Sequence, residues 1–314
     1  MLKKLNDIAI DNKSTASILR IGLGLVFVIG GYNKLSQLFD PERMAGIVGS
    51  YTGGKGYINE FFMDFLFSSG SWLTPWGFLT TLSTFELISG IALIAGLMVR
   101  PLALFYAFLL WTFVFSLPVV TTPGVETTVS TYTSPAMFVQ MRDIALSGFM
   151  FVLLLLGSGR MSADSLLLKN GVNTENANWN NLGLLLRLSL AAPLVIGGMF
   201  GGYAQIATFA TYQPLLFVLG VLLVVGIRTR EVSAIVVAVM LWFVFTKLNF
   251  EKSLIANLNG FKREFAFIAA AAVIVLRGSG DSYTPKDILN RTKYAFGKLP
   301  QLSLIHISEP TRPY

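Results

Sequence analysis

The chain has 314 residues, of which 54% are hydrophobic and 13% charged, and its formal net charge is +7. A soluble domain carries about 25% charged residues, so this composition indicates an integral membrane protein. The absence of cysteine excludes disulfides, a cysteine nucleophile and thiolate-bound iron–sulfur clusters within this chain. The basic residues lie beside apolar stretches, which indicates membrane topology rather than binding to nucleic acid.

The only histidine is His306, and it lies in the segment 303–314. This segment resembles a translated sequencing adaptor, so we interpret it as a non-native tail. Without His306 the chain offers no imidazole ligand, and we expect no haem, iron–sulfur cluster or metal site in it. Lysines interleaved with Asp7 and Asp11 precede the first apolar stretch. We therefore interpret that stretch as a membrane helix rather than a cleavable signal.

Eight apolar stretches follow one another along the chain, and a membrane span takes about 20 residues. They lie near 16–36, 76–98, 101–120, 138–157, 181–202, 213–228, 231–248 and 261–278. The sequence therefore predicts an all-α integral membrane protein with eight transmembrane helices. Two loops stand out between them. The segment 37–75 holds an amphipathic stretch that suits a helix at the membrane surface, and 117–137 is rich in Thr, Ser and Pro.

Lysine and arginine in the short loops predict the orientation, because such residues favour the cytoplasmic side. If eight spans are present, all of these residues fall on one side, and both termini are cytoplasmic. We expect a multi-pass protein of a bacterial inner membrane. The residues concerned are Lys3, Lys4, Lys13, Arg100, Arg160, Lys169, Arg228, Arg230, Lys286, Arg291, Lys293 and Lys298.

The membrane pattern occurs twice. Each copy has an arginine before a Gly-Gly pair, a glycine–arginine turn, a Leu-Trp segment, an arginine–acid pair and a closing Gly-Ser-Gly. The first copy has Arg20, Gly30-Gly31, Gly96, Arg100, Leu110-Trp111, Arg142-Asp143 and Gly157–Gly159, and the second has Arg187, Gly197-Gly198, Gly226, Arg230, Leu241-Trp242, Arg263-Glu264 and Gly278–Gly280. Four spans per copy give both copies one topology, that is, a parallel repeat.

The repeat divides the chain into five predicted segments. They are a first four-helix repeat with long outer loops (1–160), a cytoplasmic linker (161–180), a second, degenerate four-helix repeat (181–280), a basic cytoplasmic tail (281–302) and the non-native tail (303–314).

Two charges distinguish the first copy from the second. Lys34 and Glu86 are predicted near the outer ends of the first and second spans, whereas Gly201 and Leu216 take the corresponding positions in the second copy. Losing one partner of a buried ion pair strands a charge, which is costly. The joint loss therefore predicts that Lys34 and Glu86 touch, and that they mark a site restricted to the first copy.

The fourth span begins with a further pair, Arg142-Asp143, at the same predicted depth. One interpretation is a structural ion network that locks the helix bundle. The other is an outer-facing pocket for a small anion or a quinone ring. For this pocket we assign Glu86 and Asp143 as catalytic residues, and Lys34, Arg142, Tyr32 and Trp111 as substrate-binding residues.

Several of these residues carry a family resemblance. The pattern Arg20, Gly30-Gly31, Lys34, Glu86, Gly90, Gly96 and Arg100 resembles the DoxX-like membrane family over about residues 14–160. It looks closest to the DoxD type, the membrane subunit of thiosulfate:quinone oxidoreductase. The resemblance implies a four-helix bundle as the unit, a respiratory-chain setting, quinone as acceptor and a small DoxA-like partner. No DoxA-like globular segment is visible in the sequence.

Three functional hypotheses remain. The first is a quinone-linked oxidoreductase subunit of the thiosulfate:quinone type, which binds quinone or a small anion in the first copy. The second is a non-catalytic accessory subunit of a larger membrane complex, with the outer loops as docking surfaces. The third is a transporter of small solutes or lipids. The lipid bilayer, other membrane subunits and a second copy of the chain are the partners that we expect.

Overall fold

The computed structural model describes residues 10–52, 64, 67, 72–116, 130–131, 134–167, 177–200 and 213–297. Within these residues the chain forms twelve helices and one short antiparallel hairpin of Ser130–Thr131 (β1) and Ser134–Pro135 (β2). The predicted all-α class is confirmed. The amphipathic stretch 58–67, except Asp64 and Phe67, lies outside the described residues, as do 117–129 and 298–314.

Each predicted span overlaps one long helix. These helices are α2 (Asn12–Leu38), α5 (Pro75–Ala95), α6 (Val99–Ser116), α8 (Ala136–Leu156), α10 (Trp179–Phe200), α12 (Gln213–Val225), α13 (Thr229–Lys247) and α15 (Lys262–Arg277). By length and composition, α2, α5, α8, α10 and α13 are able to cross a membrane, while α6 and α12 are shorter apolar helices. The described residues thus belong to a multi-pass membrane protein.

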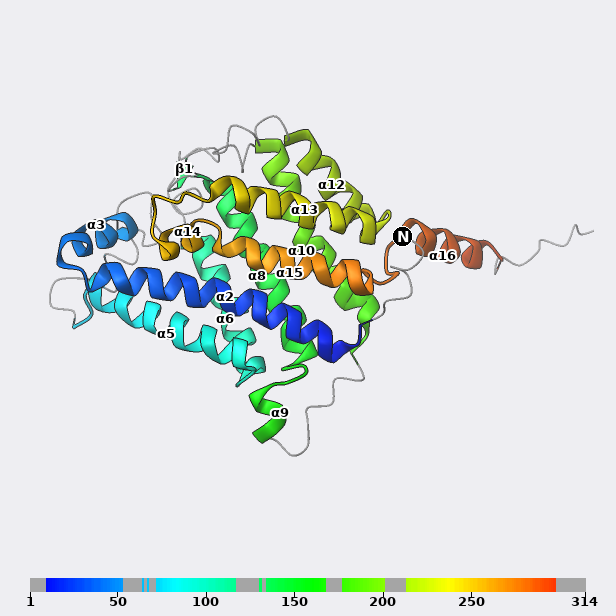
Figure 1. Ribbon diagram of the computed structural model, residues 1–314. Coiled ribbons are helices and arrows are strands. Elements are labelled where there is room, and N and C mark those ends of the chain that lie inside the picture. Colours follow the sequence, from blue (N-terminus) through cyan, green and yellow to red (C-terminus); the bar gives the residue numbers. More distant parts are fainter. Residues whose placement is uncertain are drawn as a thin grey trace, which may run out of the picture.

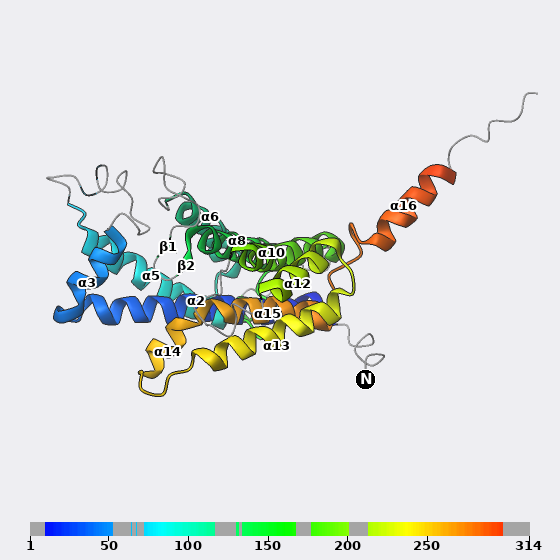
Figure 2. The same cartoon turned by 90° about the horizontal axis from the view of Figure 1, so that it is seen from above.

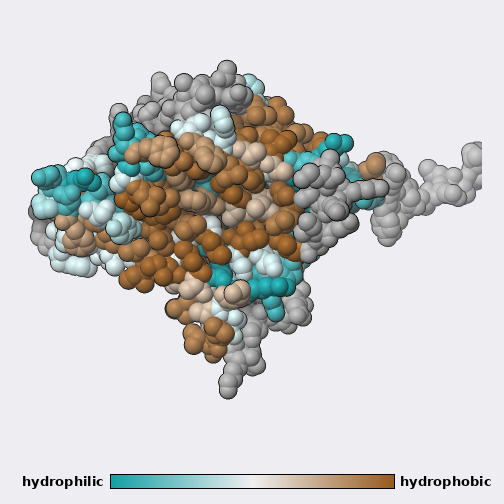
Figure 3. Space-filling model, in the orientation of Figure 1, coloured by the Kyte–Doolittle hydropathy of each residue, from teal (hydrophilic) through white to brown (hydrophobic). Residues whose placement is uncertain are grey.

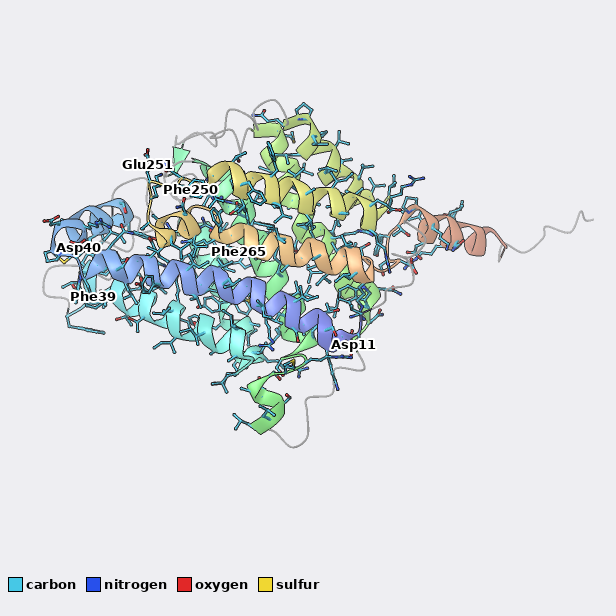
Figure 4. All side chains as sticks on the ribbon, viewed as in Figure 1. Asp11, Phe39, Asp40, Phe250, Glu251 and Phe265 are labelled. Atoms are coloured by element: carbon cyan, nitrogen blue, oxygen red, sulfur yellow. The ribbon has the colours of Figure 1, made fainter. Side chains whose placement is uncertain are left out.

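Four further helices were not predicted. They are α3 (Pro41–Thr52), α9 (Ala163–Leu167), α14 (Leu254–Gly260) and α16 (Pro285–Gly297). The corner between α2 and α3 is marked by Phe39 and Asp40 in Figure 4, at the opposite end of α2 from Asp11. Helix α3 begins with proline, whose fixed φ suits a first helical position, and an Asp40 carboxylate oxygen accepts from the N–H of Glu42 at 3.0 Å.

The eight long helices form two layers. Helices α5, α2, α15 and α13 lie side by side in one layer, and α6, α8, α10 and α12 in the other (Figures 1 and 2). The first copy supplies α2, α5, α6 and α8, and the second copy supplies the rest. The copies meet where α2 packs on α15 and where α8 packs on α10. Helix α16 projects away from both layers (Figure 2).

Glycines allow the closest of these contacts, between α2 and α5. A Cβ added at Gly31 would lie 2.6 Å from the backbone nitrogen of Leu87 and 2.7 Å from the carbonyl oxygen of Ser83. A Cβ at Gly24 would lie 2.9 Å from the carbonyl oxygen of Gly90. Small residues let two membrane helices approach closely, so Gly24 and Gly31 allow the close contact between α2 and α5.

In each copy, a buried arginine of the first long helix binds the loop that follows the fourth long helix. Arg20 is 3% exposed and donates to the carbonyl oxygens of Arg160 and Met161 at 3.0 and 2.9 Å, as well as to the last turn of α5. Arg187 is fully buried and donates to the carbonyl oxygens of Ser282 and Tyr283 at 3.0 and 3.2 Å. The two guanidinium groups thus satisfy loop carbonyls, and Arg20 also satisfies carbonyls that the end of α5 leaves without partners.

The surface matches a membrane setting. Apolar side chains cover the middle of the face formed by α5, α2, α15 and α13, and hydrophilic side chains gather at its two ends (Figure 3). Large apolar side chains such as Ile88, Phe108 and Phe245 are exposed by 63%, 60% and 67%. An apolar band of this extent on a soluble monomer would promote aggregation, whereas in a bilayer it faces lipid.

Candidate binding cavity

A cavity of about 290 Å³ opens at the end of the helices where α3 lies. Helices α2, α3, α5, α6 and α8 of the first copy surround it, and α15 of the second copy closes it. Most of its wall is apolar: Val26, Phe27, Phe78, Leu79, Leu82, Leu109, Leu110, Phe113 and Leu146.

The apolar wall is held in place from behind. The ring of Phe27 stacks on that of Tyr106, with 3.7 Å between centroids. Tyr106 is fully buried, and its hydroxyl shares a hydrogen bond of 2.5 Å with the hydroxyl of Ser89. Because Tyr106 and Ser89 are packed and hydrogen-bonded behind Phe27, the apolar wall is rigid and has its shape before any ligand binds.

Five charged side chains gather on the remaining wall. The three cations are Lys34, Lys262 and Arg263, and the two anions are Glu86 and Asp143. By formal charge, this part of the wall has one cation more than anions. In a water-poor apolar surrounding such a surplus attracts an anion or an electron-rich oxygen more strongly than it would in water.

Lys34 and Glu86 form an ion pair across the contact between α2 and α5. Their side chains are 11% and 6% exposed, so both charges are removed from water. A pair buried in this way survives because each charge compensates the other. The contact predicted from the joint loss of these charges in the second copy is confirmed.

A second ion pair joins the two copies. The Nε atom of Arg263 on α15 lies 3.6 Å from the Oδ1 atom of Asp143 on α8, and the Asp143 side chain is 2% exposed. Arg263 is more accessible, with 26% of its side chain exposed. The guanidinium thus reaches from the rim of the cavity to a deeply buried carboxylate.

Lys262 enters the cavity through a gap left by a glycine. Its ammonium donates to the Oδ1 of Asn259 at 2.8 Å, and a Cβ added at Gly30 would lie 3.1 Å from its Nζ. The Gly-Gly pair of α2 therefore has two separate roles: Gly31 admits α5, and Gly30 admits the ammonium of α15.

Tyr51 on α3 covers the cavity on the side of the helix ends. Burial raises the pKa of its phenol, and the negative charges of Glu86 and Asp143 act in the same direction while Arg263 opposes them. The phenol consequently stays protonated at neutral pH. A protonated phenol is a hydrogen-bond donor at the apolar mouth of the cavity.

Not all of the predicted site residues meet here. Arg142 is not among the residues that line the cavity. Of the four charges predicted to lie at one depth, Lys34, Glu86 and Asp143 line this cavity, and the assignment of Arg142 as a substrate-binding residue stays a prediction. Consecutive helical residues point in directions about 100° apart, so Arg142 and Asp143 face different neighbours.

The two predicted aromatic residues also lie elsewhere. Tyr32 is 51% exposed, and Trp111 packs beside Phe115 with 5.8 Å between ring centroids. Neither lines the cavity. Both positions suit side chains of the membrane interface or lipid-facing surface.

Three polar residues of the cavity wall were not among the predicted site residues: Tyr51, Lys262 and Arg263. Tyr51 lies on a helix that was not predicted. Lys262 adjoins the arginine–acid pair of the second copy, and the first copy has Met141 in the matching place. A search for charges specific to the second copy would have found it. The cavity that contains Lys34 and Glu86 is thus not confined to the first copy, because Lys262 and Arg263 of the second copy also line it.

No group of three or more His, Asp or Glu side chains suitable for a metal ion occurs within the described parts of the chain. Residues 15–118 match the DoxX family, a segment that covers α2, α3, α5 and α6. No match was found among curated proteins or among solved structures.

Proposed function

We propose, for a membrane protein whose residues 15–118 form a DoxX-family segment, that the cavity binds the head group of a quinone. The chain would then be the membrane subunit of a quinone-linked oxidoreductase. One observation carries the proposal: a largely apolar cavity of about 290 Å³ has three cations and two carboxylates on one part of its wall.

The residues present fit such a ligand. Ligand cavities are mostly apolar with a few polar groups that set orientation. The wall around Phe27 and Leu110 suits the ring and the first part of an apolar tail. The ammonium groups of Lys34 and Lys262 and the hydroxyl of Tyr51 are donors, and quinone carbonyl oxygens accept hydrogen bonds.

A bound quinone supplies two-electron chemistry coupled to the uptake of two protons. The chain's own residues would orient the ring and handle protons. Lys262 and Lys34 would bind the carbonyl oxygens, while Glu86 and Asp143 would hold protons within reach of them. The described residues contain no cysteine, so the electrons would come from the substrate or from a partner protein.

The finer assignments belong to the same proposal. We infer a DoxD-like role in thiosulfate:quinone chemistry, a small DoxA-like partner, and a location in a bacterial inner membrane. We also infer eight spans arranged as a parallel repeat with both termini cytoplasmic. The support is that every predicted span overlaps a helix and that in both copies a buried arginine of the first helix donates to the loop after the fourth helix.

The test is equilibrium binding of a short-chain ubiquinone analogue to the purified full-length protein in lipid nanodiscs. Lys262→Met should weaken binding about tenfold, because a hydrogen bond to a charged donor contributes about 1.5–3 kcal/mol. Lys252→Met is the matched control, since Lys252 is exposed and absent from the cavity wall. Equal affinities of wild type and Lys262→Met would remove the site.

A second candidate function is a non-catalytic accessory subunit. It is favoured by the pairing of Lys34 with Glu86 and of Asp143 with Arg263, because paired buried charges also serve purely structural roles. This alternative predicts that the ubiquinone analogue does not bind and that Glu86→Gln lowers only the thermal stability.

A further inference from the structure

Each copy is followed by a short helix, α9 after α8 and α16 after α15. The segments that lead into these two helices lie beside the start of α2. The N–H of Arg160 donates to the carbonyl oxygen of Lys13 at 3.2 Å, and the guanidinium of Arg277 donates to the hydroxyl of Thr15 at 3.0 Å. Both short helices therefore begin at the same end of the bundle, at the end of α2 that lies away from α3.

The two short helices occupy equivalent places in the repeat. Met161 and Tyr283 precede them, both have a left-handed φ, of 49° and 54°, and the carbonyl oxygen of each accepts from the buried arginine of its copy. The next residue, Ser162 or Thr284, accepts with its hydroxyl from the N–H three residues later, at 3.2 Å in both copies. Residues of α9 and α16 can therefore be compared position by position.

The comparison shows large apolar side chains at the same exposed positions. Leu166 and Leu167 on α9 are 84% and 70% exposed, and the equivalent residues on α16, Ile288 and Leu289, are 52% and 54% exposed. Removing such side chains from water stabilises a protein in proportion to their apolar area. A pair of this kind in both copies, at the end of the membrane helices, indicates an apolar surrounding that the chain itself does not supply.

Helix α16 also has the charge pattern of a helix that lies on a membrane surface. A rotation of about 100° per residue places Lys286 and Arg291 on the two sides of Ile288 and Leu289, and it places Asn290 on the opposite face. Cationic side chains beside an apolar strip keep their stems in the apolar layer and extend their charges to the lipid head groups. The charge of α16 therefore complements anionic lipids.

Helix α9 has no lysine or arginine, and hydrogen bonds attach it to the bundle. The carboxylate of Asp164 accepts from the N–H groups of Met98 and Val99 at 2.8 and 3.2 Å. The N–H of Asp164 donates to the carbonyl oxygen of Gly96 at 2.9 Å. The turn between α5 and α6 thus fixes the position of α9, and with it the direction in which its two leucines are presented.

The carboxylate of α16 makes its contacts locally instead. Asp287 accepts from the N–H of Tyr283 at 2.9 Å and pairs with Arg291 at 3.0 Å. Helix α16 projects away from both layers of long helices (Figure 2). Because the layers do not hold α16, its orientation depends on what its apolar strip meets outside the bundle.

We propose that α9 and α16 lie on the surface of one lipid leaflet, with Leu166, Leu167, Ile288 and Leu289 below the head groups, and that α16 requires anionic lipid for this position. Lipid is the occupant because α2 and α8 are long and apolar enough to cross a membrane, so the segments at their ends lie at the level of the head groups. The proposal concerns the end of the bundle away from α3 and does not depend on quinone binding.

The absence of cysteine from the chain allows single spin labels to be attached to the full-length protein. The variants are Leu166→Cys, Ile288→Cys and, as the matched control on the opposite face of α16, Asn290→Cys. Each is reconstituted into liposomes of phosphatidylglycerol or of phosphatidylcholine. Collision with oxygen, which concentrates in the bilayer, and with a water-soluble nickel chelate measures the depth of each label.

In phosphatidylglycerol the labels of Leu166→Cys and Ile288→Cys should favour oxygen, and that of Asn290→Cys should favour the nickel chelate. In phosphatidylcholine the label on α9 should stay shielded, because hydrogen bonds hold α9 in place, whereas the label of Ile288→Cys should become accessible to nickel. Adding Lys286→Gln to Ile288→Cys should weaken the partition of α16 into phosphatidylglycerol about fivefold, as the loss of one cation near an anionic surface implies.

Three results would overturn the proposal. The first is equal accessibility of the Ile288→Cys and Asn290→Cys labels to nickel in phosphatidylglycerol. The second is the same depth of α16 in both lipids. The third is broadening of the Ile288→Cys spectrum that disappears on dilution with unlabelled protein, since it would identify a second copy of the chain as the cover of the apolar strip.

Discussion

Asp143 on α8 and Arg263 on α15 form an ion pair, with 3.6 Å between Oδ1 and Nε, that ties the fourth helix of one copy to the fourth helix of the other. These residues belong to the arginine–acid pairs that both copies keep. Each copy thus contributes one residue of its arginine–acid pair to the contact between the copies. The same two residues are two of the five charged side chains that line the cavity of about 290 Å³.

Replacing Arg263 should weaken both the interface and the cavity. In Arg263→Gln the buried Asp143 loses its compensating charge, so we expect the free energy of unfolding to fall by about 1–3 kcal/mol. The loss should be smaller in the double variant Asp143→Asn/Arg263→Gln, because no carboxylate is then stranded. Denaturant titration in micelles measures both. Additive effects of the two single changes would contradict the pairing.

The ion pair of Lys34 and Glu86 can be tested by a double-mutant cycle. Its second change introduces the apolar residue that the second copy has at the corresponding position. Lys34→Met alone should lower the free energy of unfolding by about 3–5 kcal/mol, since it leaves Glu86 buried and uncompensated. Adding Glu86→Leu, which copies Leu216, should recover most of that loss. If the double variant is less stable than Lys34→Met alone, the charges are not acting as a pair.

Glycine substitutions test the close contact of α2 with α5. Gly31→Ala places a Cβ 2.6 Å from a backbone nitrogen of α5, so the helices must move apart, at a cost of about 1–3 kcal/mol. Gly46→Ala on α3 meets nothing within 4 Å and should be neutral or slightly stabilising. Thermal midpoints compare the two variants, and equal midpoints would rule out the proposed crowding.

The N-cap of α2 should give a stability that depends on pH. Hydrogen bonds from the side chain and the backbone N–H of Ser14, and then Arg160, lower the pKa of Asp11. Asp11→Ala should therefore cost about 1 kcal/mol at neutral pH. Because the folded pKa is depressed, this contribution is complete above the unfolded value of about 3.9 and is lost as the pH falls below it.

Unfolding of wild type and Asp11→Ala at pH 7 and pH 3 would check this prediction. The difference between the two proteins should shrink at the lower pH. A difference that stays constant would show that the carboxylate charge is not the stabilising group. Asp11→Asn is the companion variant, because asparagine keeps the cap acceptor and loses the charge.

Much of the architecture was predictable because the chain repeats itself. Each copy has one of the equivalent arginines, Arg20 or Arg187, and each donates to carbonyl oxygens of the loop after the fourth long helix of its copy. The charges found in one copy alone, Lys34 and Glu86, proved to touch. The apolar stretches also placed the helices, since burial in lipid or core demands apolar residues over a whole span.

The rest depended on side-chain direction and on helices without a strong pattern. Sequence spacing placed Arg142 beside Asp143 but did not show that they face different neighbours. Tyr51 lies on α3, whose twelve residues include two glycines and are not apolar enough to be recognised as a span. Lys262 belongs to the second copy but lines a cavity built mostly by the first copy. A sequence pattern within one copy does not indicate which residues of the other copy it will contact.

The closing of the cavity of about 290 Å³ by α15 has a consequence for biosynthesis. The ribosome makes α2, α3, α5, α6 and α8 first, and α15 is the last of the eight long helices to emerge. Until then the ion pair of Lys34 and Glu86 faces an open side, without the cations that complete the wall. A prematurely terminated chain would therefore enter the membrane with no finished cavity, and binding would begin only with the completed protein.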